Sequence, residues 1–331
     1  MLRLLSFISV LSLLISCGGP DEYIVTLQGN TQGTTYKILY VVDQPIRYNE
    51  AVDSILFAVD RSMSAWNPHS TLSKVNRGMD SLLDPLFQQV IKRGLQVSQM
   101  TNGAFDMTVA PLVNAWGFGS MEKADVDSAY VDSLLGISGY KRLHLLSSGR
   151  LHRPDGMQID VNAIAQGYSV DLVADYLESK GINNYLIEIG GEMRANGTKF
   201  GNNSWVVGID KPMETIQEER FQITLNLDTM SLATSGNYRK FIVDEETGIK
   251  YSHTIDPHTG YPVSDRLLSA TILSPDCMTA DAVATACMVM GLDNAKVWVQ
   301  EQPEFEAYFI YSDLTGDLQE WWTPGFEKRK R

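Results

Sequence analysis

Two short segments near the C-terminal end of the chain carry side chains that could do chemistry. The first runs from Tyr251 to Val263 and contains His253, Asp256 and His258. Proline, glycine and threonine separate these residues, which is typical of tight turns. We expect a loop that presents the three side chains toward one point. A neutral imidazole there could remove a proton from a substrate; the alternative is a histidine that only supports the loop.

The second segment, Met278 to Gly291, has the composition of a helix, because alanine, valine and methionine fill it. Thr279 is a suitable N-cap, and Gly291 is a suitable C-terminal stop. Asp281 and Thr285 are four positions apart and therefore share one face of this helix. A carboxylate and a hydroxyl there could bind a hard cation through oxygen atoms. The alternative is that both are ordinary polar groups near a helix N-terminus.

Two further segments place acidic or small residues where a predicted strand ends. Asp160 lies at a strand-to-helix transition, where its carboxylate could cap the helix or accept a hydrogen bond from a ligand. Gly167 follows in the same helix and permits close approach of another backbone. Gly190 and Gly191 follow an apolar strand, and their amides have room to face a phosphate. Glycine pairs after strands are also common in simple turns, so this pair alone does not identify a site.

Several other sites are excluded by the sequence. It contains no G-x-G-x-x-G fingerprint and no P-loop. It also lacks a G-x-S-x-G elbow, so a serine hydrolase triad is not expected. The chain has 331 residues and a formal net charge of −13. Binding of nucleic acid needs a basic face, so this charge argues against a nucleic-acid partner.

The N-terminus has the organisation of a secretion signal. Arg3 precedes an apolar run from Leu4 to Leu14, which is too short to span a bilayer permanently. The run ends in Leu14-Ile-Ser-Cys17, which resembles the cleavage box of bacterial lipoproteins. We expect residues 1–17 to be a lipoprotein signal with Cys17 lipidated, and residues 18–22 to be a spacer behind the membrane anchor. The alternative is an ordinary signal peptide with an incidental cysteine.

Two cysteines remain, Cys277 and Cys287. Their spacing fits neither a zinc site nor a redox pair. We expect two buried thiols, and a disulfide is the alternative outside the cytoplasm.

The hydrophobic pattern predicts a mixture of helices and strands. Helices are expected at 49–63, 85–101, 126–135 and 163–180, and strands at 23–27, 35–42, 143–160 (around a turn), 185–189, 205–209, 221–227, 238–243, 267–273 and 307–311. Small or polar residues fill Ser64–Asn76 and Ser231–Asn237, which we expect to be loops. Strands and helices do not alternate strictly. This favours an α+β fold with mostly antiparallel sheets over a doubly wound fold.

The motifs occur in one order along the chain, and that order resembles a known family. The sequence is similar to the FAD:protein FMN transferase family, the ApbE-type flavin transferase lipoproteins. The similar motifs, beyond the lipoprotein box, are Gly33–Tyr36, Met63–Trp66, Ser70–Asn76, Gly103–Thr108, Asp160–Tyr168, Ile189–Glu192, Ser235–Tyr238, Ser252–Gly260, Ala280–Thr285 and Met290–Gly291. They cover nearly all of the chain after Cys17, and a chance match of so many spaced motifs is implausible.

The resemblance implies a T-fold-like α+β domain over residues 23–325, as one unit or as two subdomains. It also implies that this domain binds FAD together with Mg²⁺, or with Mn²⁺, since oxygen ligands suit both ions. Members of the family break the FAD pyrophosphate, move FMN onto a threonine or serine hydroxyl of a target protein and release AMP. Their targets are typically membrane subunits of redox pumps that are exposed outside the cytoplasm.

The site residues follow from the same resemblance, position by position. Asp281, Thr285 and the carbonyl of Ala163 would bind the metal. The residues that would line the FAD site are Trp66, Ala104, Phe105, Asp106, Asp160, Gln166 and Ile255.

The resemblance also directs attention to proton transfer, because the target hydroxyl must lose its proton. His253 and Asp256 are the available bases, and His253 is favoured. A cation held by Asp281 would neutralise the diphosphate and stabilise the departing AMP. Gln32 and Gln166 depart from the residues common in the family, and both departures concern contacts with the flavin.

The sequence therefore predicts a flavin transferase of the bacterial cell envelope, anchored to a membrane by lipid and facing the extracytoplasmic side. Hydrolysis is the first alternative, because water in place of the target hydroxyl would convert FAD to FMN and AMP at the same site. The second alternative is a flavin-binding lipoprotein without catalytic activity. The presence of Asp281, Thr285 and the His253 loop argues against it.

Overall fold

The computed structural model describes residues 22–119, 124–212, 220–237, 241–243 and 250–331. The predicted signal peptide with Cys17 and most of the predicted spacer lie outside these residues, as does the predicted start of a strand at 238–240. The described part of the chain forms a main sheet of eight strands and three two-stranded sheets. None of its helices is long and apolar enough to cross a membrane.

The main sheet runs in the order β1-β2-β5-β6-β9-β12-β13-β14, and neighbouring strands are antiparallel throughout. Its strands are β1 (Tyr23–Thr31), β2 (Thr34–Val42), β5 (Tyr185–Ile189), β6 (Glu192–Asn196), β9 (Met230–Gly236), β12 (Leu267–Ser274), β13 (Glu306–Ser312) and β14 (Leu318–Trp322). The short sheets pair β3 (His144–Leu145) with β4 (Leu151–His152), β7 (Trp205–Asp210) with β8 (Phe221–Leu227), and β10 (Phe241–Val243) with β11 (Lys250–Ser252). The α-helices are α1 (Asn49–Met63), α2 (Thr71–Asn76), α3 (Pro85–Met100), α4 (Ala110–Ala115), α5 (Ser128–Leu135), α6 (Asn162–Ser179), α7 (Cys277–Met290), α8 (Leu292–Gln300) and α9 (Pro324–Glu327), with 3₁₀ turns at Met107–Val109, Tyr140–Arg142 and Phe200–Asn202.

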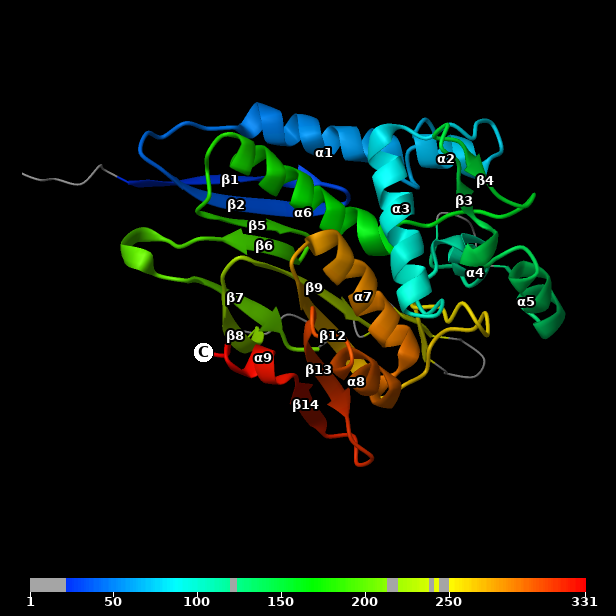
Figure 1. Cartoon of the computed structure of the whole chain (residues 1–331). Helices are drawn as coiled ribbons and strands as arrows, with labels where there is room; N and C mark the ends of the chain where they lie inside the picture. Colours follow the sequence, from blue (N-terminus) through cyan, green and yellow to red (C-terminus); the bar gives the residue numbers. More distant parts are fainter. Residues whose placement is uncertain (1–21, 120–123, 213–219, 238–240, 244–249) are drawn as a thin grey trace, which may run out of the picture.

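The order of elements repeats in the two halves of the main sheet. In the first half, α1 and α6 come between the strand pairs β1-β2 and β5-β6. In the second half, α7 and α8 come between β9-β12 and β13-β14. Figure 1 shows these helices lying along the sheet, with α1 and α6 over the first half and α7 and α8 over the second. Because the halves join where β6 pairs with β9, α6 and α7 pack against each other above this junction.

Alternation along the strands gives the two faces of the sheet separate cores. Ile38 and Tyr40 of β2 face the helices, whereas Leu39 and Val41 face the opposite side. On that opposite side β7, β8 and α9 cover the sheet through Trp205 and other buried residues. A third and larger core lies among α3, α7 and the strands of the second half. The helical side is therefore fully packed, and it can hold side chains in fixed positions.

The predicted α+β class with mostly antiparallel sheets is confirmed, and α1 and β5 have the predicted bounds. Cys277 and Cys287 are both free and buried, as predicted. The loop predicted at Ser231–Asn237 is wrong, because β9 occupies the middle of the sheet there. Its small residues suit this position because α7 packs directly on β9. The loop predicted at Ser64–Asn76 is also partly wrong, since it contains α2.

The N-terminus of α7 is fixed by two carboxylates. Asp276, rather than the predicted Thr279, is the N-cap, and its carboxylate accepts a hydrogen bond from the Thr279 amide at 2.9 Å. Asp171 of α6 accepts the amides of Cys277 and Met278 at 3.0 and 2.8 Å. The first amides of a helix have no partner within the helix. Asp171 thus satisfies two of them and ties α7 to α6.

Asp171→Ala is expected to lower the free energy of unfolding by about 2–3 kcal/mol, because two buried amides lose a charged acceptor. Chemical denaturation of the purified protein measures this change. Asp175→Ala is the control. Asp175 lies on the same helix, its side chain is 67% exposed, and it is 3.7 Å from the guanidinium of Arg194, so its loss should change stability by less than about 1 kcal/mol. Equal losses in the two variants would contradict the role of Asp171.

Candidate functional site

The site begins at the contact between α6 and α7. The amide of Gly167 donates a hydrogen bond to the carboxylate Oδ2 of Asp281 at 3.1 Å. A Cβ atom on Gly167 would lie 2.3 Å from the carbonyl oxygen of Cys277 and 2.9 Å from the Cβ of Asp281. Any side chain at this position would push the helices apart. The close approach predicted for Gly167 is therefore confirmed, and the approaching backbone is that of α7.

The first turn of α6 is irregular at Ala163. Its φ and ψ of −89° and 23° are not helical. In a regular helix the Gly167 amide would bond to the carbonyl of Ala163, four residues earlier. The same amide donates to Asp281. Ala163 thus lies in a distorted turn four residues before the glycine that contacts Asp281, and its role as a backbone ligand stays a prediction.

Thr285 adds a hydroxyl one helical turn beyond Asp281. Its Oγ1 is hydrogen-bonded to the Oγ of Ser235 at 2.9 Å, near the end of β9. The three oxygen donors, from Asp281, Thr285 and Ala163, are of the type that hard divalent cations prefer. The residues present therefore fit Mg²⁺ or Mn²⁺ in chemical type.

Burial disfavours the charged form of the Asp281 carboxyl group. Burial raises the pKa of its carboxyl group to about 7, and the hydrogen bond from Gly167 opposes only part of this effect. A nearby cation would stabilise the charged carboxylate in this buried position.

The loop that carries His253 is attached to the same end of β9. Thr254 donates a hydrogen bond from its hydroxyl to the side-chain carbonyl of Asn237 at 2.7 Å, and Asn237 immediately follows β9. The Val263 amide closes the loop on the carbonyl of Thr254 at 2.8 Å. Asn237 is two residues beyond Ser235, which contacts Thr285. The predicted base and the predicted metal ligands are thus linked through one strand end.

The predicted bases differ in their surroundings. His253 is half-buried, and its ring packs edge-on against Phe118 with 6.5 Å between ring centroids. Asp256 accepts the backbone amide and the Nδ1 of His258 through Oδ1 at 2.9 and 3.0 Å, and the Thr259 hydroxyl through Oδ2 at 3.0 Å. Both oxygens of Asp256 therefore shape the turn.

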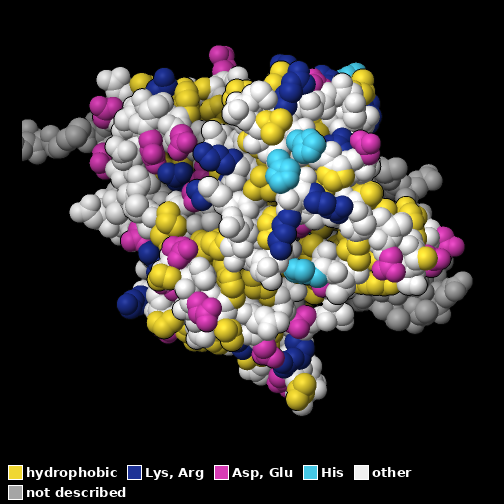
Figure 2. Space-filling view, turned by 45° about the vertical axis from the view of Figure 1, so that its right-hand side comes forward, with side chains coloured by type: hydrophobic (Ala, Val, Ile, Leu, Met, Phe, Trp, Pro, Cys, Tyr) yellow, Lys and Arg dark blue, Asp and Glu magenta, His cyan; other side chains and the backbone are white. Residues whose placement is uncertain are grey.

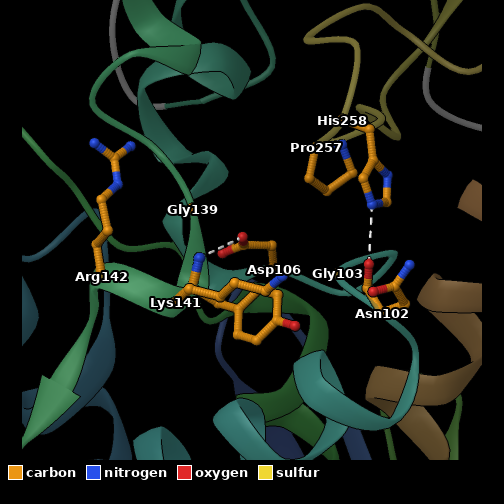
Figure 3. A pocket seen from close by; sticks show the side chains of 9 residues that line it. Asn102, Gly103, Asp106, Gly139, Lys141, Arg142, Pro257 and His258 are labelled. Carbon is orange, nitrogen blue, oxygen red and sulfur yellow. Dashed lines mark hydrogen bonds between the residues drawn. The ribbon is translucent and has the colours of Figure 1, made fainter.

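A pocket of about 530 Å³ lies beside this loop (Figure 3). His258 closes one side of it, with its Nε2 3.0 Å from the carbonyl oxygen of Asn102. Lys141 and Arg142 also line the pocket. Figure 2 shows Lys, Arg and His side chains gathered on one face of the molecule, although the net charge of the chain is −13. The charge is unevenly distributed, and an anion would meet basic groups on this face.

The other predicted FAD residues fall into two groups. Ala104 and Phe105 are buried in the main core, and Ile255 is buried in a small core with Trp116. Asp106 borders the pocket (Figure 3). Its carboxylate accepts the amide and hydroxyl of Thr108 and the amide of Tyr140, at 2.7 to 2.8 Å. Burial raises the pKa of Asp106.

The second group lies at the start of α6 and at the surface. Asp160 caps the first amide of α6 by accepting from Asn162 at 2.7 Å, and burial raises its pKa. Gln166 donates from Nε2 to the carbonyl of Ile189 at 3.2 Å. Trp66 lies at the surface and is 70% exposed. Their predicted contacts with FAD stay predictions.

Sequence reasoning assigned no role to two residues of this neighbourhood. Ser235 was noted only within a motif, yet it contacts Thr285. Glu192, the first residue of β6, is buried among the same elements. Both residues lie near the end of a strand, and this position in the sequence is the feature that could have indicated a role for them.

Comparison with known proteins identifies the family of this chain. A model of the ApbE family matches residues 32–309. The chain belongs to the ApbE family. A relative from Vibrio cholerae named FAD:protein FMN transferase is 38% identical over 85% of each chain, and one of the same name from Escherichia coli K12 is 29% identical over 92% of this chain and 88% of the relative.

Solved structures of ApbE proteins have the same fold. The flavin transferase ApbE from Vibrio cholerae has a TM-score of 0.81 and 32% identity, and covers 93% of this chain and all of its own. The apo flavinyl transferase ApbE from Pseudomonas stutzeri has a TM-score of 0.82 and 29% identity, over 93% of this chain and 97% of its own. The match therefore extends over nearly all of this chain.

Proposed function

We propose that this protein transfers FMN from FAD to a threonine or serine hydroxyl of another protein and releases AMP. The relatives named FAD:protein FMN transferase support the reaction. The observation that carries the proposal is the junction of α6 and α7, where the Gly167 amide holds the carboxylate of Asp281 beside the irregular turn of Ala163. Thr285 adds a hydroxyl to the same face of α7.

The cation in this proposal is Mg²⁺, and Mn²⁺ would be held by the same oxygens. Asp281, Thr285 and the carbonyl of Ala163 would hold it. When bound, it would neutralise negative charge on the diphosphate and on the departing AMP. The chain supplies the position: Gly167 fixes one carboxylate oxygen of Asp281, and Ser235 fixes the Thr285 hydroxyl.

The transfer is a substitution at phosphorus. The hydroxyl oxygen of the target forms a bond to the phosphorus of the FMN half, while the bond from that phosphorus to the bridging oxygen breaks. The bridging oxygen leaves with AMP and keeps the bonding electron pair. The hydroxyl proton passes to His253. This assignment rests on the half-buried ring beside Phe118 and on the loop that ties His253 to the strand end behind Thr285.

We further propose that the protein works at a membrane outside the cytoplasm of a bacterium. The apolar run and the Leu14-Ile-Ser-Cys17 box support lipidation of Cys17. A lipid anchor would keep the site near acceptor proteins that are themselves in the membrane, such as subunits of redox pumps.

The reaction is tested with purified protein, FAD, Mg²⁺ and a threonine-bearing acceptor domain. We expect a fluorescent covalent flavin band on a denaturing gel. Asp281→Asn should lower its rate of formation at least about 100-fold, because loss of a metal ligand costs more than loss of an outer contact. Asp293→Asn is the control, since this residue of α8 is 83% exposed and should leave the rate unchanged. Free FMN without a band would support hydrolysis, unchanged FAD would support simple binding, and full activity of Asp281→Asn would remove the metal assignment.

The anchor is tested by cell fractionation. The wild-type chain should sediment with membranes, and a Cys17→Ser variant should be released, because it has no thiol to acylate. An equal distribution of the two proteins would contradict lipidation at this position.

A further inference from the structure

Glu192 is a buried carboxylate with an unsatisfied oxygen. The residue is 9% exposed, and among the described residues its Oε2 has no hydrogen-bond partner. Buried acidic groups in folded proteins are usually hydrogen-bonded, paired with a cation or bound to a metal. An orphaned carboxylate oxygen in a packed layer therefore requires an explanation.

The position of Glu192 is set by the register of the sheet. It is the first residue of β6 and pairs with Ile189 of β5. Side chains alternate along a strand, so Glu192 and Arg194 point to the same face. Arg194 contacts Asp171 of α6 at 2.9 Å, which shows that this is the helical face. Glu192 thus lies on the face of the sheet that α6 and α7 cover.

Asp281 lies at the same junction, because Ile189, the strand partner of Glu192, accepts a hydrogen bond from Gln166, and the next residue, Gly167, donates to Asp281. Burial raises the pKa of Glu192 most, and the next cause is the negative charge of Asp281. The guanidinium two residues away does not relieve this repulsion, because Arg194 is engaged by Asp171 at 2.9 Å and by Glu178 at 3.3 Å. Two carboxylates buried at one junction are unfavourable unless a positive charge lies between or beside them.

We propose that Glu192 is a second acidic residue of the cation site, which supplies from the sheet the negative charge that Asp281 supplies from α7. This inference rests on the proposed function only in that it takes Asp281 to be a metal ligand. A divalent cation would offset both carboxylates and provide a partner for the orphaned oxygen. Glu192 thereby makes the site more anionic than the predicted ligands alone, and strengthens cation binding before FAD arrives.

The test is metal binding without substrate. Purified protein is titrated with Mn²⁺, and free Mn²⁺ is measured by its electron paramagnetic resonance signal; Mg²⁺ is measured by calorimetry. Glu192→Gln should weaken binding of both ions at least about 10-fold, the range found for residues that support a metal site. It should also reduce the rise in melting temperature that saturating Mg²⁺ produces.

Glu188→Gln is the matched control. Glu188 is on the neighbouring strand, and its Oε1 accepts the Gly191 amide at 2.9 Å, a bond that glutamine can keep. Its affinity for Mn²⁺ should stay within about 2-fold of wild type, because Glu188 pairs with Met193 and points to the opposite face of the sheet from Glu192.

Asp281→Asn separates this inference from the proposed function. If Asp281→Asn loses Mn²⁺ while folded Glu192→Gln binds it like wild type, the role of Glu192 is overturned and the cation site stands. If the wild-type protein binds neither ion, both fail. Should Glu192→Gln not fold, Glu192→Ala is measured in the same way, and wild-type affinity in that variant overturns the role.

Discussion

The hydrogen bond from the Gly167 amide to the Asp281 carboxylate is the contact on which the site depends. It holds the buried carboxylate of Asp281 against the backbone of α6, where a Cβ atom on residue 167 would lie 2.3 Å from the carbonyl oxygen of Cys277. A second carboxylate, Asp171, repeats this arrangement one turn later, where it accepts the first amides of α7. The two helices are therefore joined by hydrogen bonds between carboxylates and amides as well as by apolar contact. These bonds fix the position of α7 along α6.

The sheet determines what else can reach this junction. Its halves repeat one order of strands and helices, and they meet at β6 and β9 directly beneath α6 and α7. The first residue of β6 and the last residues of β9 thus approach the junction from below. The loop that carries His253 is attached to the same end of β9 through Thr254 and Asn237. Segments far apart in the sequence converge because the antiparallel pairing of β6 with β9 joins the two halves of the sheet at its centre.

Much of this could be predicted from the sequence, and the parts that could not share a cause. Asp281 and Thr285 are on one helix, so their common face follows from helical periodicity alone. Gly167 indicated a possible close approach, because a glycine early in a helix leaves room for another backbone. By contrast, β9 has a sequence of small residues that resembles a loop, and only the packing of α7 on it makes it a strand. The burial of Glu192 depends on sheet order, which local pattern does not contain.

The central claim is that oxygens from α6 and α7 hold one divalent cation against the diphosphate of FAD. The most direct measurement is anomalous diffraction from crystals grown with Mn²⁺ and FAD. The account predicts a manganese peak within about 2.0–2.6 Å of an Asp281 carboxylate oxygen and next to the Thr285 hydroxyl and the Ala163 carbonyl. A bound FAD with no manganese peak at Asp281, or with the peak on other residues, would contradict it.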